Sequence, residues 1–106
     1  MNYVIRNEDI EQVLIGTPKG HKHLRICVKL KEKTIILQEA TIANISRAYI
    51  TIKTHPTVKA LQLERKVIPV EKAKEGYAKH QLLEIQRKEE EIEEEISKLL
   101  ETAQLL

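Results

Sequence analysis

The stretch YAKHQLLEIQRKEEEIEEEISKLLETAQLL, residues 77–106, decides the fold expected for this chain. Its apolar residues recur at steps of three and four, which is the spacing of one helical face. It contains no Pro or Gly, and both Glu84 and Glu94 precede a lysine by four residues. Such residues and pairs favour an α-helix. The stretch therefore predicts one long C-terminal helix over residues 77–106.

This helix would carry a heptad-like apolar seam that only Glu89 interrupts. A helix gains little stability by itself, so the seam needs a partner surface. Leu83 and Leu100 widen the stripe, which leaves packing on the body of the same chain open beside pairing with a second chain. The predicted oligomer seam consists of Ala78, Leu82, Ile85, Glu89, Ile92, Ile96, Leu99, Ala103 and Leu106.

The remaining residues are expected to form one small body. A chain of 106 residues with 42% hydrophobic content has room for a single core. The aromatic content is 3%, all of it Tyr, so Ile, Leu and Val must fill the interior. The expected organisation is a body over residues 1–76 and a helical arm, an association element, over residues 77–106.

The cysteine count and the hydropathy favour a cytoplasmic protein. Cys27 is the only cysteine, so an intrachain disulfide is excluded and a reducing compartment is the simplest expectation. The first ten residues lack an apolar run of signal-peptide length, and no segment approaches the 18 apolar residues of a membrane span. We therefore expect no export and no membrane partner.

Charge is distributed unevenly along the chain. Residues 1–80 hold 15 Lys/Arg and 8 Asp/Glu, whereas residues 81–106 hold 3 and 8. The body is thus basic and the arm acidic. The acidic run can lie on a basic surface, or the basic body can bind an anionic partner, but the simplest interpretation of the Glu run is a solvated charged face.

The N-terminal residues predict short elements followed by a loop. Tyr3 to Ile5 are expected to form an edge strand. Asn7 is a suitable cap for a short helix over residues 8–15, with Glu8 and Asp9 in its first turn. Gly16, Pro18 and Gly20 then predict a loop. This loop lacks the spacing of a phosphate-binding motif.

The clearest strand covers residues 23–31. Leu24, Ile26, Val28 and Leu30 alternate there with polar or basic residues, so one face is expected in the core and the other in solvent. Residues 34–38 return as a second strand of a hairpin.

Residues 39–54 are predicted to form a helix that ends before His55-Pro56. A third strand follows at residues 58–64, and a fourth edge strand with Pro69 at residues 67–70. The expected fold class is therefore α+β, a ββαβ-type body with a long C-terminal helix. The alternative is a β-meander or small barrel plus the C-terminal helix, in which residues 47–54 form a strand.

Few residues suggest catalysis. Asp9 is the only aspartate, and Ser46 and Ser97 are the only serines, none in a nucleophile motif. His21, His23 and Cys27 could share a strand face, but a second ligand cluster with zinc spacing is missing. We therefore expect no catalytic residue, metal site or cofactor, and the assignment leans away from an enzyme.

The expected function is that of a non-enzymatic, homo-oligomeric interaction module, most simply a homodimer formed through a coiled coil of C-terminal helices. An alternative is weakly sequence-specific nucleic-acid binding through a basic strand face. A small enzyme of unknown chemistry ranks third. The candidate anion-binding face consists of Arg25, Lys29, Lys31, Lys33, Arg47 and Lys53.

Overall fold

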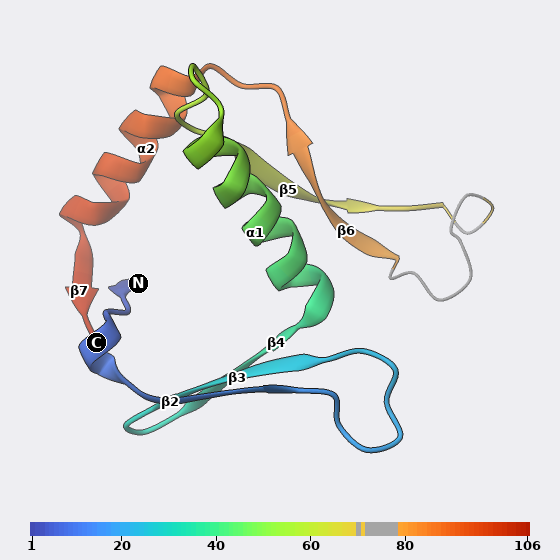
Figure 1. Cartoon of the computed structure of the whole chain (residues 1–106). Coiled ribbons are helices and arrows are strands. Elements are labelled where there is room, and N and C mark those ends of the chain that lie inside the picture. Colours follow the sequence, from blue (N-terminus) through green and yellow to red (C-terminus); the bar gives the residue numbers. More distant parts are fainter. Residues whose placement is uncertain (70, 72–78) are drawn as a thin grey trace. The chain divides into compact units, whose positions relative to one another are not determined.

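The fold mixes α and β structure, as expected. The computed structural model describes residues 1–69, 71 and 79–106. Over these residues it contains seven strands in three sheets and two α-helices (Figure 1). In chain order they are β1 (Asn2–Val4), the 3-10 helix η1 (Asn7–Asp9), β2 (Ile10–Gly16), β3 (Arg25–Leu30), β4 (Thr34–Gln38), α1 (Glu39–Thr54), β5 (Gln62–Val67), β6 (His80–Ile85), α2 (Glu89–Glu101) and β7 (Ala103–Leu105).

The chain forms two compact units, and the division falls within both α-helices. The first unit comprises Met1–Ile42 and Glu95–Leu106, and the second comprises Ala43–Glu94. Segments from both ends of the chain therefore belong to the first unit.

An antiparallel sheet in the order β2-β3-β4 organises the first unit (Figure 1). Its register places Cys27 of β3 opposite Leu14 of β2 and Ile36 of β4. These three residues form an apolar row across one face, because residues opposite one another in a sheet point to the same side. The other face is almost entirely apolar and carries Val13, Ile15, Ile26, Val28, Leu30, Ile35 and Leu37.

The burial expected for the central strand is confirmed only in part. Leu30 is buried, and Lys29 and Lys31 are exposed, as the alternation predicts. The strand begins at Arg25 rather than at residue 23, so Leu24 precedes it. Leu24, Ile26 and Val28 are only half-buried, as is Arg25. The sheet therefore has the predicted period of two without a deep core on either face.

Residues 10–16 form a strand, so the helix expected over residues 8–15 is wrong. Only the single 3-10 turn Asn7–Asp9 is helical, and its N-cap is Arg6 rather than Asn7. The apolar residues of this segment fit either period over so short a length. Pairing with β3 decides between them, since six β2 residues lie opposite β3 and alternate ones among them form backbone hydrogen bonds with it.

A short parallel pair joins the two ends of the first unit. β1 pairs with β7 in the register Asn2–Ala103 to Val4–Leu105. The amide Nδ2 of Asn2 also donates a hydrogen bond of 2.9 Å to Oγ1 of Thr102. The predicted edge strand at residues 3–5 is therefore present, shifted by one residue.

The second unit contains the antiparallel ribbon β5-β6 and parts of both helices. Gln62 pairs with Ile85 at one end of the ribbon and Val67 with His80 at the other. Ala60 and Ile92 are the buried apolar residues of this unit among those the structure describes. The strand predicted at residues 58–64 is thus found at 62–67. The separate edge strand predicted at residues 67–70 is wrong over its described residues, because Val67 ends β5 and Ile68 and Pro69 are not in a strand, while Val70 lies outside the described residues.

Helix α1 has the predicted bounds, Glu39–Thr54, and ends before His55-Pro56. The alternative in which residues 47–54 form a strand is therefore wrong. The ββαβ order is not confirmed, because β5 pairs with β6 and belongs to a different sheet from β3 and β4. Strand partners depend on contacts distant in sequence, which local periodicity does not report.

A single helix over residues 77–106 is also wrong. Helix α2 covers Glu89–Glu101, while His80–Ile85 form strand β6 and Ala103–Leu105 form strand β7. Leu82 and Ile85 have helical spacing, but six residues hold too few turns to distinguish a helix from a strand. The acidic first turn of α2, Glu89 to Glu91, suits the positive end of the helix dipole and marks the true beginning.

Candidate functional site

The predicted oligomer seam is distributed over several elements instead of one helix. Leu82 and Ile85 lie on β6, Ala103 lies on β7, and Leu106 follows it. Ala78 lies outside the described residues. The remaining four seam residues, Glu89, Ile92, Ile96 and Leu99, lie on α2. A continuous heptad seam is therefore absent over the part of the chain that the structure describes.

Two of the four seam residues on α2, Glu89 and Ile92, contact or pack within the second unit. Ile92 is 6% exposed. The carboxylate Oε1 of Glu89 accepts a hydrogen bond of 3.1 Å from the backbone N–H of Lys59. The interruption of the apolar seam at Glu89 thus has a structural explanation, because this carboxylate satisfies a backbone donor.

The C-terminal half of α2 presents an exposed apolar stripe. Ile96, Leu99 and Leu100 are 50%, 47% and 59% exposed. Their spacing of three and four residues places them on one helical face. We call these three residues the α2 stripe. Ile96 and Leu99 belong to the predicted seam, and Leu100 is one of the two residues expected to widen it.

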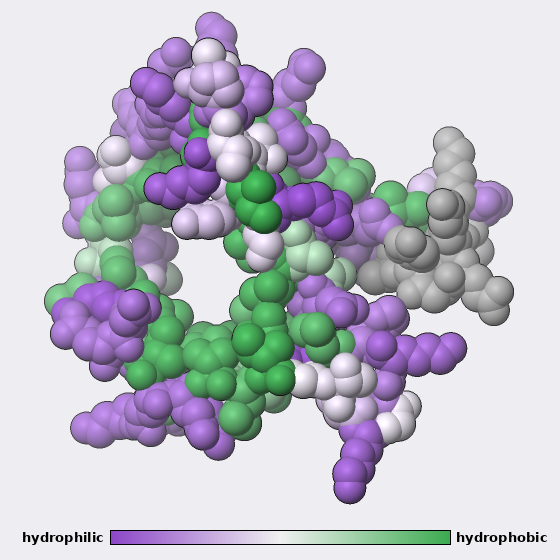
Figure 2. Space-filling model, viewed as in Figure 1, coloured by the Kyte–Doolittle hydropathy of each residue, from purple (hydrophilic) through white to green (hydrophobic). Residues whose placement is uncertain are grey.

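The sheet of the first unit exposes further apolar side chains. Ile36 is 63% exposed and Leu14 is 46% exposed, and both belong to the row that crosses the sheet through Cys27. On the opposite face Ile15 is 66% exposed. Figure 2 shows apolar residues at the surface over this sheet, in the lower part of the view. Sequence reasoning missed the row, because it assigned Leu14 to a helix.

The six residues of the candidate basic face are divided between the two units of the chain. Lys29, Lys31 and Lys33 lie on or beside the β3-β4 hairpin, whereas Arg47 and Lys53 lie on α1 in the second unit. Binding of nucleic acid by these residues stays a prediction.

Two of the hairpin cations already have partners within the chain. Nη1 of Arg25 donates hydrogen bonds to the carbonyl oxygens of His23 and Leu24, at 3.3 and 3.2 Å. Nζ of Lys33 lies 5.7 Å from the centroid of the Tyr3 ring, within cation–π range. These contacts orient the two side chains and occupy one donor of Arg25, while both side chains keep their positive charge.

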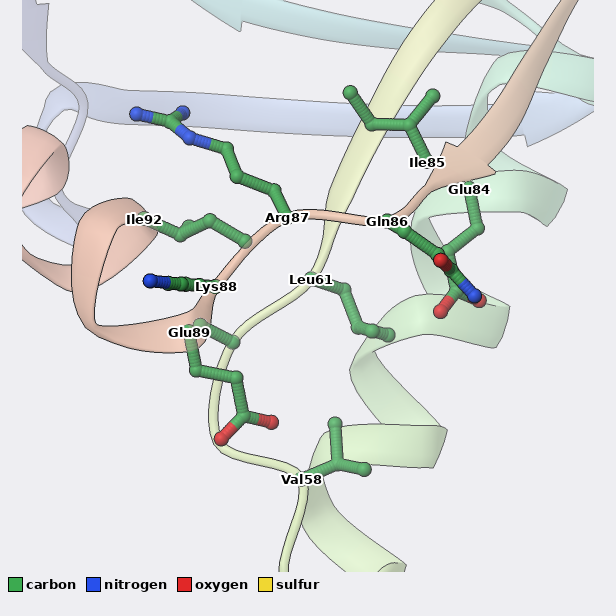
Figure 3. Close-up of a pocket in the computed structure, with 10 residues that line it drawn as sticks. Val58, Leu61, Glu84, Ile85, Gln86, Arg87, Lys88, Glu89 and Ile92 are labelled. Carbon is green, nitrogen blue, oxygen red and sulfur yellow. The ribbon is translucent and has the colours of Figure 1, made fainter.

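The second unit has an open pocket of about 540 Å³ between the segment that follows α1 and the segment that joins β6 to α2 (Figure 3). Arg87, which lines the pocket, contacts two other residues of the chain. Its Nη1 donates a hydrogen bond to Oε1 of Gln62 at 2.8 Å, and its Nε lies 3.5 Å from Oε2 of Glu91. The described lining residues include no Ser, Cys, His or Asp, and they are Val58, Ala60, Leu61, Glu84, Ile85, Gln86, Arg87, Lys88, Glu89 and Ile92.

The histidines considered as metal ligands lie elsewhere. His21 and His23 precede β3, which begins at Arg25, so they do not share a strand face with Cys27. Nδ1 of His23 lies 3.0 Å from Oε2 of Glu39. Among the residues that the structure describes, three or more His, Cys, Asp or Glu side chains do not gather in a metal-binding arrangement.

The two described α-helices were compared with the length and hydropathy of a membrane span. Neither α1 nor α2 is long and apolar enough to cross a bilayer.

Comparison with known proteins does not assign the chain to a family. No family model, characterised protein or solved structure matches it. The functional assignment therefore depends on the chain's own surfaces.

Proposed function

We propose that the chain is a non-enzymatic interaction module that associates with copies of itself, most simply as a dimer, and that the α2 stripe contributes to the interface. The observation that carries the proposal is the exposure of large apolar side chains in organised sets. Scattered apolar residues are normal on a protein surface, but a contiguous stripe favours a binding surface.

The size of the units supports the same proposal. Each unit holds about 50 residues, a size at which a single core is marginal and association commonly adds stability. Within the described residues only Leu30, Ala60 and Ile92 are buried apolar residues. Covering exposed Ile and Leu side chains with a second copy would enlarge this small core.

The α2 stripe alone would give a weak contact. Burying three half-exposed Ile and Leu side chains contributes on the order of 2 to 4 kcal/mol per chain. Association costs about 4 to 15 kcal/mol in lost translational and rotational freedom. Two copies together gain about 4 to 8 kcal/mol from the stripe, which offsets only the lower part of this cost, so a stable assembly requires surface beyond the stripe.

The first test is the mass of the protein in solution. Wild-type protein is expected to sediment as a dimer or larger assembly. Replacing Ile96 and Leu100 together with Asp should raise the dissociation constant by roughly tenfold or more, because the interface would then bury unpaired charge. Ile92 is unsuitable for this test, since it belongs to the core of the second unit.

Lys98→Asp is the matched control. It changes the net charge by the same two units as the double variant, and it lies on the opposite side of the helix from Ile96. The control should retain the wild-type mass, and circular dichroism should show helix in both variants. A wild-type protein that remains a monomer at high concentration would contradict the proposed function.

A further inference from the structure

The free edge of β4 is identified by its backbone hydrogen bonding. β4 is the terminal strand of the sheet β2-β3-β4. The N–H of Leu30 donates to the carbonyl of Lys33 at 2.8 Å, which makes that opposing pair a hydrogen-bonded one. Bonded and non-bonded pairs alternate along an antiparallel ladder. The N–H and C=O groups of Thr34 and Ile36 and the N–H of Gln38 therefore point away from β3. Gln38 directly precedes α1, so its C=O accepts the first hydrogen bond of that helix.

This edge lacks the features that usually prevent strands from pairing with another molecule. Natural proteins protect free edges with charges, prolines or bulges. β2 has a register shift between Ile10 and Gln12, β5 carries three consecutive charged residues, and β6 carries Glu84. β4 reads Thr-Ile-Ile-Leu-Gln, with neither charge nor Pro nor Gly, and its described ladder with β3 is regular.

We propose that β4 pairs antiparallel with β4 of a second copy, about a two-fold axis at Ile36. This inference rests on the proposed function and names the surface that would carry it. In this register Ile36 lies opposite Ile36 of the second copy, and Thr34 lies opposite Gln38. Ile36 then exchanges two ladder hydrogen bonds with Ile36 of the second copy, and the N–H of Gln38 donates to the C=O of Thr34 on the opposing strand.

The same register makes the side-chain rows of the two sheets match. The row Leu14–Cys27–Ile36 continues directly into the identical row of the second copy. On the opposite face Ile35 lies opposite Leu37 of the second copy, so apolar rows also continue there. Cross-strand apolar pairs of this kind stabilise a sheet. A second copy is therefore a better partner than a charged peptide, because β4 has no charged side chain to pair with the charges of such a peptide.

The proposed pairing ends at a dimer and does not continue into a longer assembly. Each chain has one β4 edge, and a two-fold contact uses both, which leaves the bulged β2 strands at the outside of a six-stranded sheet. The exposed Ile36 side chain, 63% accessible in the single chain, would then have an apolar neighbour on the second copy.

The decisive experiment is cysteine cross-linking in the full chain. Cys27 is first replaced by Ser, because it lies directly opposite position 36 on β3. Ile36→Cys should then give a covalent dimer under mild oxidation, since opposing residues of a hydrogen-bonded pair have Cα atoms about 5.5 Å apart, within disulfide range. Val13→Cys, on the outer edge of β2, is the matched control and should cross-link far more slowly.

A proline variant tests the backbone contact independently. Ile36→Pro removes an outward N–H and leaves the bonds between β3 and β4 intact. It should raise the dissociation constant by roughly tenfold or more, whereas Val13→Pro on the other edge should not. A wild-type dimer that fails to cross-link at position 36 would overturn this inference while leaving the proposed function standing. A monomeric wild type would overturn both.

Discussion

At the scale of single residues, the best-defined polar contact joins Arg6 and Asp9. Nε and Nη2 of Arg6 donate to the two carboxylate oxygens of Asp9 at 3.1 and 3.0 Å, and the backbone N–H of Arg6 donates to Oδ2 at 2.9 Å. The side-chain hydrogen bonds, followed by the backbone one, lower the pKa of Asp9 below its ordinary value. The contact fixes the turn that leads from β1 into β2.

Asp9→Asn should therefore change the acid end of the stability profile. Because the folded pKa of Asp9 is lowered, its stabilisation is present above the unfolded pKa of about 3.9 and is lost as the pH falls through the folded value. The variant should unfold at lower urea concentration than wild type near pH 6, and the difference should shrink below about pH 4. Urea unfolding at a series of pH values measures this.

Glu8→Gln is the control for that experiment. Glu8 also contacts the guanidinium of Arg6, at 3.2 Å, but its carboxylate is not the acceptor of the Arg6 backbone N–H. An equal change in acid dependence for both variants would show that general charge, rather than the Asp9 contact, governs the profile.

At the scale of elements, the alternating pattern of β3 predicts the strand correctly but does not predict how deeply each of its residues is buried. The alternation of its apolar residues predicts equal burial of Ile26 and Leu30. In the structure Leu30 is 6% exposed and Ile26 is only half-buried. Burial depends on what covers the face, and this differs along the strand.

Leu30→Ala should therefore destabilise the fold more than Ile26→Ala. Removing the buried Leu30 side chain is expected to cost about 2 to 5 kcal/mol, the range for well-packed sites, and Ile26→Ala should cost less. Chemical denaturation at low protein concentration, where association contributes least, compares the two. Equal losses would mean that both residues are covered to the same extent in solution.

At the scale of the whole molecule, strands β1 and β7 connect residues that are about a hundred positions apart in the sequence. Deleting residues 103–106 should release β1, because its described strand partner would be gone. Hydrogen exchange should then show faster exchange in Asn2–Val4, while the amide of Val28, in the central strand, keeps its protection. Unchanged exchange in Asn2–Val4 would indicate that β1 is stabilised by other contacts.

Local periodicity was sufficient where an element is long or strictly patterned. The alternation along residues 23–31 predicted β3, and the spacing along residues 39–54 predicted α1 with its correct bounds. Ile96 and Leu99 of the α2 stripe were likewise included in the predicted seam. These features depend on near neighbours in the chain, so the sequence by itself determined them.

Tertiary pairing decided the rest. Residues 10–16 and 80–85 carry apolar residues at spacings that suit a helix or a strand, and each became a strand because a distant segment, β3 or β5, satisfied its backbone hydrogen bonds. The row Leu14–Cys27–Ile36 follows from the register of three strands, which no local pattern encodes. Backbone groups must be paired somewhere, and only the folded chain determines with which partner.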